Sequence, residues 1–205
     1  MSGQESAGPA SVVEAERLAR DGLAAVLGRP KVVLDIGFGR AELLMDLAHE
    51  RPERCFLGVE VSRKRVAKAA RRVHRRGLTN CFLLHATAEY AVERVLPERS
   101  VSECWICCPD PWPKKRHHKR RLIQAPFVDH LVRLLEPDAP LHIATDDPAY
   151  ADWIAEVMRT DRGLTNLHAP RPYSRVRPER RATAYEQEWL DEGRRMAYFD
   201  YRRRA

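Results

Sequence analysis

The sequence has 205 residues, of which 44% are apolar and 32% are charged, and its formal net charge is +7. This composition is typical of a globular chain that is long enough to bury its own core, and it excludes a disordered or fibrous protein. The basic surplus favours a polyanionic partner such as nucleic acid or an anionic membrane surface, although many basic proteins bind neither.

The start of the chain, residues 1–10, is small and polar and lacks the apolar segment of a secretory signal. No apolar run approaches the roughly 18 residues that span a bilayer. We therefore expect a cytoplasmic protein without a membrane segment, with a disordered tail at 1–10 and a single domain at 11–205. The cysteines are odd in number and only Cys104 and Cys107 are spaced as C-x-x-C, so we expect reduced thiols and no metal site.

The predicted elements alternate between helices and short apolar strands. The residues 11–14 read Ser-Val-Val-Glu, a pattern typical of a capping box, and predict a helix to about Leu27. Strands are expected at 31–36, 55–60, 81–84, 102–107, 140–144 and 196–201. Helices are expected after residue 39, at 62–76, in a short stretch after 84, at 122–135 and at 147–158. This alternation predicts an α/β protein with a Rossmann-like fold, in which helices cover both faces of a mostly parallel sheet.

A cofactor site is indicated at the end of the first of these strands. Gly37 and Gly39 form a turn that lets the backbone come close to a ligand, next to the start of a helix. Glu60 ends the following strand, where a carboxylate can accept hydrogen bonds from ribose hydroxyls. The same pattern also fits a nicotinamide or flavin site, or a tight turn without a ligand.

Two residues favour S-adenosylmethionine over a dinucleotide. The third glycine of the dinucleotide fingerprint is absent, because Arg40 and Ala41 follow Gly39. Asp35 lies just before the turn, where its charge would repel a pyrophosphate but attract the sulfonium and ammonium groups of S-adenosylmethionine. A nicotinamide-dependent oxidoreductase remains the alternative from this end of the chain.

The most distinctive segment follows the strand at 102–107. Asp110 stands between two prolines, which restrict its backbone, and Trp112 offers a flat face on which a base could stack. Residues 114–121 contain six Lys or Arg and two His, enough to neutralise several phosphates. The predicted helix at 63–76 carries eight further Lys or Arg and no acid, which fits an exposed helix face equally well.

The segment 110–121, with the sequence DPWPKKRHHKRR, resembles the signature of bacterial tRNA (guanine-N7-)-methyltransferases. Four shorter motifs in the same order are similar to that family, namely LDIGFG at 34–39, GVE at 58–60, HIATD at 142–146 and TAYE at 183–186. The family usually has glycine where Ala41 stands and an acid near Thr87. The resemblance implies transfer of a methyl group from S-adenosylmethionine to N7 of a guanosine in the variable loop of tRNA.

The resemblance also implies roles for individual residues. Cofactor contacts are expected from Asp35, Gly37, Gly39, Glu60, Thr87 and Asp110. Substrate contacts are expected from Lys114, Arg116, Lys119, Arg120, Asp146, Thr183, Tyr185 and Glu186. Asp110 is the expected catalytic residue, because its carboxylate could stabilise the positive charge that develops on the purine or fix the base.

Three alternatives stay open from the sequence. The chain could be a tRNA-binding member of the fold with weakened catalysis, a methyltransferase for another RNA, or the oxidoreductase mentioned above. No obligatory partner subunit is indicated, and we expect a monomer or a homodimer.

Overall fold

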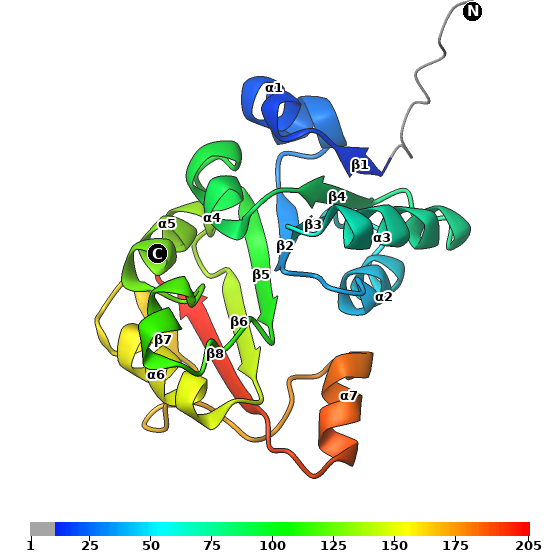
Figure 1. The fold of residues 1–205 in the computed structure, drawn as a ribbon. Coiled ribbons are helices and arrows are strands. Elements are labelled where there is room, and N and C mark those ends of the chain that lie inside the picture. The colour runs from blue at the N-terminus through cyan, green and yellow to red at the C-terminus, as the bar shows by residue number, and fades with distance from the viewer. Residues whose placement is uncertain (1–10) are drawn as a thin grey trace, which may run out of the picture.

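The computed structural model describes residues 11–205, apart from the side chain of residue 184. An eight-stranded sheet runs through the molecule in the order β1-β4-β3-β2-β5-β6-β8-β7 (Figure 1). The strands are β1 (Val12–Val13), β2 (Val32–Ile36), β3 (Phe56–Glu60), β4 (Cys81–His85), β5 (Val101–Cys107), β6 (Pro140–Thr145), β7 (Leu164–Asn166) and β8 (Ala197–Arg203). The first six strands of this order are parallel, and β8 and β7 complete the sheet antiparallel. The predicted mostly parallel α/β sheet is therefore confirmed.

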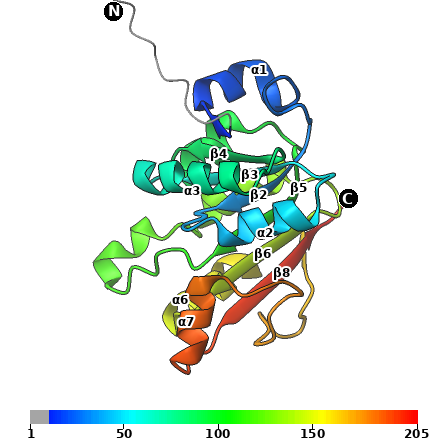
Figure 2. The ribbon, with the colours of Figure 1, turned by 90° about the vertical axis from the view of Figure 1, so that its right-hand side faces the viewer.

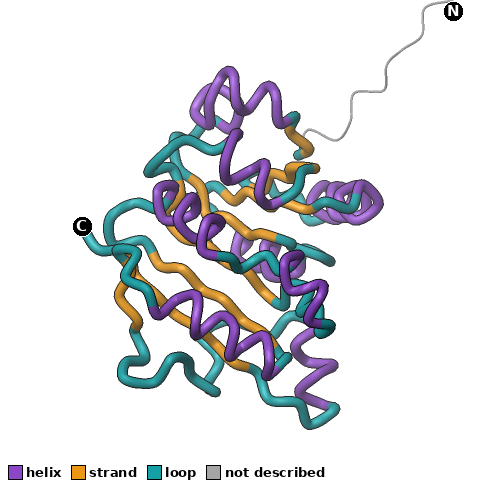
Figure 3. Tube along the Cα trace, turned by 60° about the vertical axis from the view of Figure 1, so that its left-hand side comes forward, coloured by secondary structure: helices purple, strands orange, loops and turns teal. Residues whose placement is uncertain are grey.

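Helices cover both faces of the sheet, as Figure 3 shows. The helices are α1 (Ala15–Leu27), α2 (Glu42–Glu50), α3 (Arg63–Arg75), α4 (Ala88–Tyr90), α5 (Ala125–Leu134), α6 (Pro148–Arg159) and α7 (Ala184–Asp191). A π-helical turn, η1 (Ala91–Val95), and a 3-10 helix, η2 (Lys115–Arg120), complete the set. Buried residues of α2 and α3 form one core with one face of the sheet, whereas those of α1, η1, α5 and α6 form the core on the other face.

The expected capping box at residues 11–14 is wrong. Val12 and Val13 instead form the short strand β1, which pairs with Leu83 and Leu84 of β4. The helix begins only at Ala15, and its N-cap residue makes no side-chain capping bond. The β-branched valines extend the sheet at its edge and bury Val13, which outweighs the local capping pattern.

Two further differences lie at the end of the chain. The expected final strand is β8, but it extends to Arg203 and runs antiparallel to β6. Leu164–Asn166 adds the edge strand β7, which the sequence did not predict because it is short and only partly buried.

The predicted N-cap at Asp147 is confirmed, because its carboxylate accepts a hydrogen bond from the Tyr150 N–H at 2.7 Å. Within residues 11–205, no helix is both long and apolar enough to cross a membrane.

Candidate active site

A cavity of about 500 Å³ lies at the carboxyl edge of the parallel strands. Its walls come from the turn after β2, the loop after β5 and the segment around the start of α7. It brings together six of the predicted site residues, namely Asp35, Gly37, Gly39, Asp110, Thr183 and Tyr185. Ligands of open α/β sheets bind at this edge, so the cavity is the candidate active site.

The turn that follows β2 requires an unusual backbone. Gly37 and Gly39 have φ values of 72° and 52°, and Ala41 has a φ of 58°. The left-handed conformation is open to glycine but costs an alanine about 1 kcal/mol. Ala41 is fully buried and serves as the N-cap of α2, so the chain keeps the turn geometry with alanine at this position.

Gly58 of β3 makes room for this turn. A Cβ atom at this position would lie 2.5 Å from Leu44 Cδ2 and 2.5 Å from Phe38 Cδ1. Such distances are far inside van der Waals contact, so any side chain at residue 58 would push the turn and α2 away from the sheet. The sequence motif containing Gly58 is thus explained by packing of α2 against β3.

Glu60 links the turns that follow β2 and β3. Its carboxylate accepts hydrogen bonds from the Gly39 N–H at 3.1 Å and from the Ser62 N–H at 2.9 Å, and it lies 3.5 Å from the Arg65 guanidinium. The side chain is only 3% exposed and does not line the cavity. A carboxylate has capacity for further hydrogen bonds, so a ribose contact at Glu60 stays a prediction.

Asp35 is the carboxylate at the base of the cavity. It is 4% exposed, and no side-chain hydrogen bond to it is found among the described residues. Burial raises the pKa of Asp35 to about 7, while the nearby Arg180 guanidinium lowers it and the Glu60 charge raises it further. A buried carboxylate without a hydrogen-bond donor fits a cationic ligand, because such a ligand would stabilise the ionised form.

The loop after β5 brings Asp110 to the same cavity. Cys108 and Trp112 have φ values of 51° and 44°, which strain this segment on both sides of Asp110. Asp110 itself is exposed and lines the cavity. The two carboxylates, Asp35 and Asp110, therefore reach one space from neighbouring strands β2 and β5.

Arg121 does not belong to the exposed basic run. Its side chain is buried, its Nε donates a hydrogen bond to the Pro111 carbonyl at 2.9 Å, and its guanidinium lies 5.1 Å from the ring centres of both Tyr150 and Trp153. Arg121 thus fastens the loop to α6. The expectation that Arg121 neutralises phosphates with the rest of residues 114–121 is wrong, because its side chain is buried.

The remaining cations of this segment are exposed. Figure 2 shows η2 projecting from the carboxyl edge of the sheet. Lys114, Arg116 and Lys119 make no side-chain hydrogen bond or ion pair with the described part of the chain. The Arg120 guanidinium lies 5.0 Å from the Trp112 ring centre, so the cation occupies a face on which we expected a base to stack.

The C-terminal wall depends on a buried ion pair. Thr183 and Glu186 form a capping box at the start of α7. Glu186 is fully buried, and its carboxylate accepts hydrogen bonds from Arg180 at 2.6 and 2.8 Å and from the Tyr198 hydroxyl at 3.2 Å. Burial raises the pKa of Glu186, but the hydrogen bonds and positive charge of Arg180, together with the hydrogen bonds from Thr183 and Tyr198, lower it by more, so the net shift is downward. Glu186 faces Arg180 in this structure, and only Thr183 and Tyr185 of this motif line the cavity.

Arg180 is the residue that sequence reasoning missed. Its side chain is 2% exposed, and its guanidinium also lies 5.3 Å from the Trp105 ring centre. The tail contains many arginines, and nothing in the sequence distinguishes this one from its exposed neighbours. The pattern Thr-x-x-Glu at 183–186 did signal a helix start, but it did not reveal the ion pair.

Two other predicted residues lie outside the cavity. Thr87 is the N-cap of α4, where its hydroxyl accepts a hydrogen bond from the Tyr90 N–H at 3.2 Å. Asp146 pairs with Arg194 at 3.0 Å. Neither lines the cavity, and their ligand contacts stay predictions. Among residues 11–205, no group of three or more His, Cys, Asp or Glu side chains could hold a metal ion.

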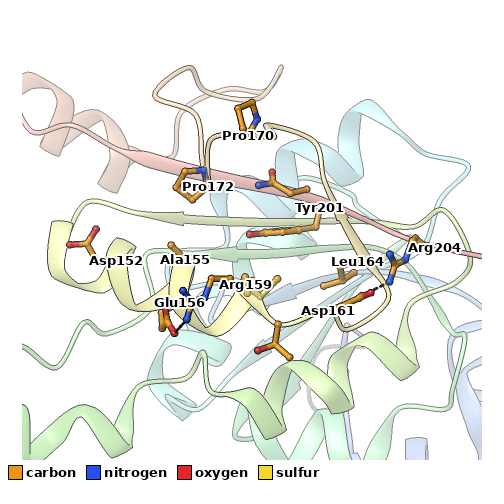
Figure 4. Close-up of a pocket in the computed structure, with 13 residues that line it drawn as sticks. Asp152, Ala155, Glu156, Arg159, Asp161, Leu164, Pro170, Pro172, Tyr201 and Arg204 are labelled. Carbon is orange, nitrogen blue, oxygen red and sulfur yellow. Dashed lines mark hydrogen bonds and ion pairs between the residues drawn. The ribbon is translucent and has the colours of Figure 1, made fainter.

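A second cleft, of about 540 Å³, lies beside α6 and β7 (Figure 4). Four of its charged groups form two pairs, Arg159 with Glu156 at 2.7 Å and Arg204 with Asp161, whereas Asp152 is exposed at its rim. It shares no residue with the cavity at the carboxyl edge and lacks a glycine turn. The second cleft therefore lacks the features that mark the cavity at the carboxyl edge as the candidate site.

Comparison with known proteins shows the family to which the chain belongs. A family model described as "Putative methyltransferase" matches residues 29–198. The tRNA (guanine-N(7)-)-methyltransferase of Halorhodospira halophila is 41% identical over 84% of the chain and 74% of its own length. That of Nitrosococcus oceani is 44% identical over 71% of the chain and 62% of its own length. The chain thus spans about two thirds of the length of these relatives.

A structural comparison shows the same fold. The antibiotic-resistance methyltransferase Kmr superposes with a TM-score of 0.60 at 20% identity, covering 91% of this chain and 93% of its own. The chain therefore shares the overall fold of this methyltransferase. Together with the extent and identity of the sequence matches, this shows that the chain belongs to the tRNA (guanine-N(7)-)-methyltransferase family.

Proposed function

We propose that the protein transfers a methyl group from S-adenosylmethionine to N7 of a guanosine in the variable loop of tRNA. One observation carries the proposal: a single cavity joins the unpaired Asp35 to Asp110 beside an exposed basic segment. The relatives named as tRNA (guanine-N(7)-)-methyltransferases support this choice of base and substrate.

The residues of the cavity and its surroundings fit the cofactor. S-adenosylmethionine supplies a methyl group on a positively charged sulfur, which makes that carbon electrophilic. Asp35 would hold a cationic part of the cofactor, since its carboxylate lacks a donor in the described structure. Gly37 and Gly39 would allow close approach to the backbone. Glu60 and Thr87 would serve the ribose and adenine ends.

The base needs orientation more than proton transfer. Guanine N7 carries a free lone pair and no proton, so no general base has to remove one. Asp110 would accept hydrogen bonds from the donor edge of the guanine and stabilise the positive charge that the purine gains. The two prolines beside Asp110 limit its backbone, so they reduce the entropy lost on orienting the base.

The other substrate residues divide into two groups. Lys114, Arg116, Lys119 and Arg120 would bind phosphates near the target nucleotide, because they lie on the exposed segment at the cavity. On the opposite wall, Tyr185 and Thr183 would meet the guanosine. Glu186 would position Thr183 and Tyr185 through its ion pair with Arg180. Asp146 would contribute indirectly, through its ion pair with Arg194.

The variant Asp110→Ala tests the proposal, with Asp152→Ala on α6 as the matched control because Asp152 is also exposed and lies outside this cavity. With saturating tRNA and labelled cofactor, Asp110→Ala should lower the turnover number roughly 10²- to 10³-fold, as expected when a group stabilising developing charge is lost. The control should keep wild-type turnover. Wild-type turnover by Asp110→Ala would overturn the role given to Asp110.

The cellular setting is part of the proposal. We infer that residues 11–205 act as one domain in the cytoplasm, as a monomer or homodimer without an obligatory partner subunit. Wild-type protein that binds tRNA without methylating it would instead indicate a binding member of the fold, and methylation of a different RNA would change the substrate. Mass spectrometry of the methylated nucleotide separates these outcomes.

A further inference from the structure

Two faces of helix α3 are accounted for inside the protein. Its apolar residues recur at the spacing of one helix face and are buried, namely Val66, Ala69, Ala70 and Val73. They pack with α2 and the sheet in one core. This face fixes the rotation of α3 about its axis, and so it determines which residues face solvent.

The flank toward α2 carries three arginines that are paired with acids. Arg65 lies 3.5 Å from Glu60, Arg72 lies 3.8 Å from Glu42, and Arg76, just past the helix end, lies 2.8 Å from Asp46. These pairs explain the cations of this flank as contacts between α3 and its neighbours. They leave the outer face to be explained.

The outer face of α3 presents Lys64, Lys68, Arg71 and Arg75, which we call the outer stripe. At 3.6 residues per turn, this spacing places them opposite the buried apolar face. All four are exposed, and none makes a side-chain hydrogen bond or ion pair within residues 11–205. The helix contains no acid, so the stripe has no counter-charge of its own.

Local stability does not explain the outer stripe. Lys64 lies in the first turn, where the helix dipole disfavours a cation, and the structure has no acid in that turn. Lys68 lies four residues after Lys64, and Arg75 four after Arg71, so like charges repel along the same face. An external anion would relieve both effects.

The length of the outer stripe favours a polyanion over a small anion. Arg75 follows Lys64 by eleven positions, which corresponds to about 16 Å at 1.5 Å per residue. This exceeds the Debye length of about 8 Å at physiological salt, so one bound ion could not neutralise both ends. A nucleic-acid backbone carries charges along such a length.

We propose that the outer stripe is a second RNA-binding surface, which binds the phosphate backbone of the tRNA away from the nucleotide in the cavity. The proposal rests on the proposed function for the identity of the RNA. Arg65, in the first turn of α3, lines the cavity, so the stripe begins beside it and leads away from it. Figure 2 shows one end of α3 on the same side of the molecule as η2.

The test neutralises the outer stripe in the full chain, with glutamine at residues 64, 68, 71 and 75, because glutamine preserves helix propensity. The matched control neutralises four cations that are also exposed and unpaired in the described structure but lie toward the amino ends of the parallel strands, namely Arg29, Arg94, Arg99 and Arg202. Both variants lose the same formal charge. Affinity for a labelled, unmodified tRNA is measured by fluorescence anisotropy across a range of salt concentrations.

The stripe variant should bind tRNA about tenfold or more weakly than the control at low salt, and the slope of log affinity against log salt should become shallower by roughly 3. KM for tRNA should rise, while the turnover number at saturating tRNA stays at the wild-type value. Exchanging lysine and arginine at the four positions should preserve the affinity. Urea unfolding confirms that each variant remains folded.

Equal tRNA affinity in the stripe variant and the control would overturn the inference. If that variant also loses binding to phosphatidylserine vesicles, the outer stripe binds an anionic membrane surface instead of RNA. The proposed function fails separately, if the wild-type protein binds tRNA through the stripe but methylates none of it.

Discussion

The two walls of the cavity are built differently. On the cofactor side, β2 and β3 lie in the middle of the sheet, and Asp35, Glu60 and the glycine turn follow from where those strands end. On the C-terminal side, the segment between β7 and β8 carries Thr183 and Tyr185 outside the sheet, and a buried Arg180–Glu186 pair holds its helix. Sheet pairing thus positions one wall, and side-chain interactions position the other.

This difference determines how each wall should respond to substitution. Changes on the cofactor side should act through local packing and charge, because the strands themselves are fixed by neighbours on both sides. Changes in the buried pair should release the whole C-terminal wall. The position of residues 183–186 therefore depends on the Arg180 side chain, which need not touch the substrate.

The largest expected effect comes from Arg180→Gln. The substitution leaves the Glu186 carboxylate buried without its cation, which should lower the free energy of unfolding by about 3–5 kcal/mol. Urea unfolding measures this loss, with the exposed pair of Arg159 and Glu156 as the control, where Arg159→Gln should cost less than about 1 kcal/mol. Replacing Arg180 and Glu186 together by methionine should recover part of the loss. A single-variant loss as small as the control's would show that the pair does not hold the wall.

The next effect tests the cofactor wall. Gly58→Ala inserts a methyl group 2.5 Å from Leu44 and Phe38, which should destabilise the protein by about 1–3 kcal/mol through overpacking. Adding Leu44→Ala removes one of the clashing side chains, so the double variant should lose less than the sum of the two single losses. Strict additivity would indicate that α2 does not pack on Gly58 in solution.

The sequence predicted the cofactor wall better than the C-terminal wall for a physical reason. The positions of Asp35, Gly37 and Gly39 follow from an apolar run that ends in a turn, and such patterns depend only on local residue types. The partners of Glu186 and the inward orientation of Arg121 depend on which of many arginines becomes buried, and charge counting contains no such information. Likewise, Val12 and Val13 became a strand only because β4 offers an open edge.

A smaller effect concerns pH and Asp35. Because the folded pKa is raised from 3.8 to about 7, the ligand-free protein loses stability as pH rises through this range, whereas affinity for a cationic ligand increases as Asp35 ionises. Between pH 6 and 8 the ionised fraction grows about tenfold, so cofactor affinity should rise by up to about tenfold, or about 1.4 kcal/mol. Calorimetry on the wild type and on Asp35→Asn measures cofactor affinity at each pH. The variant is the control, because residue 35 no longer titrates and any remaining pH dependence comes from other groups, including those of the ligand. Identical pH profiles would remove Asp35 from the site.

The smallest effect is expected from Glu188→Gln. Glu188 lies 3.2 Å from Arg40 and joins the two walls across the cavity, but both side chains are more than half exposed. An exposed pair contributes about 0–1 kcal/mol, so the urea midpoint should hardly change. A loss comparable to that of Arg180→Gln would show that the walls are held by this surface contact rather than by the buried pair.

The most direct test of the central claim is to locate the methyl group on the RNA. Unmodified tRNA is incubated with the protein and S-adenosylmethionine, digested with nuclease and mapped by mass spectrometry. We predict N7-methylguanosine in the fragment that contains the variable loop, formed roughly 10²- to 10³-fold more slowly by Asp110→Ala. A methyl group on another base, or no methylation by folded protein that binds the tRNA, would contradict the proposed function.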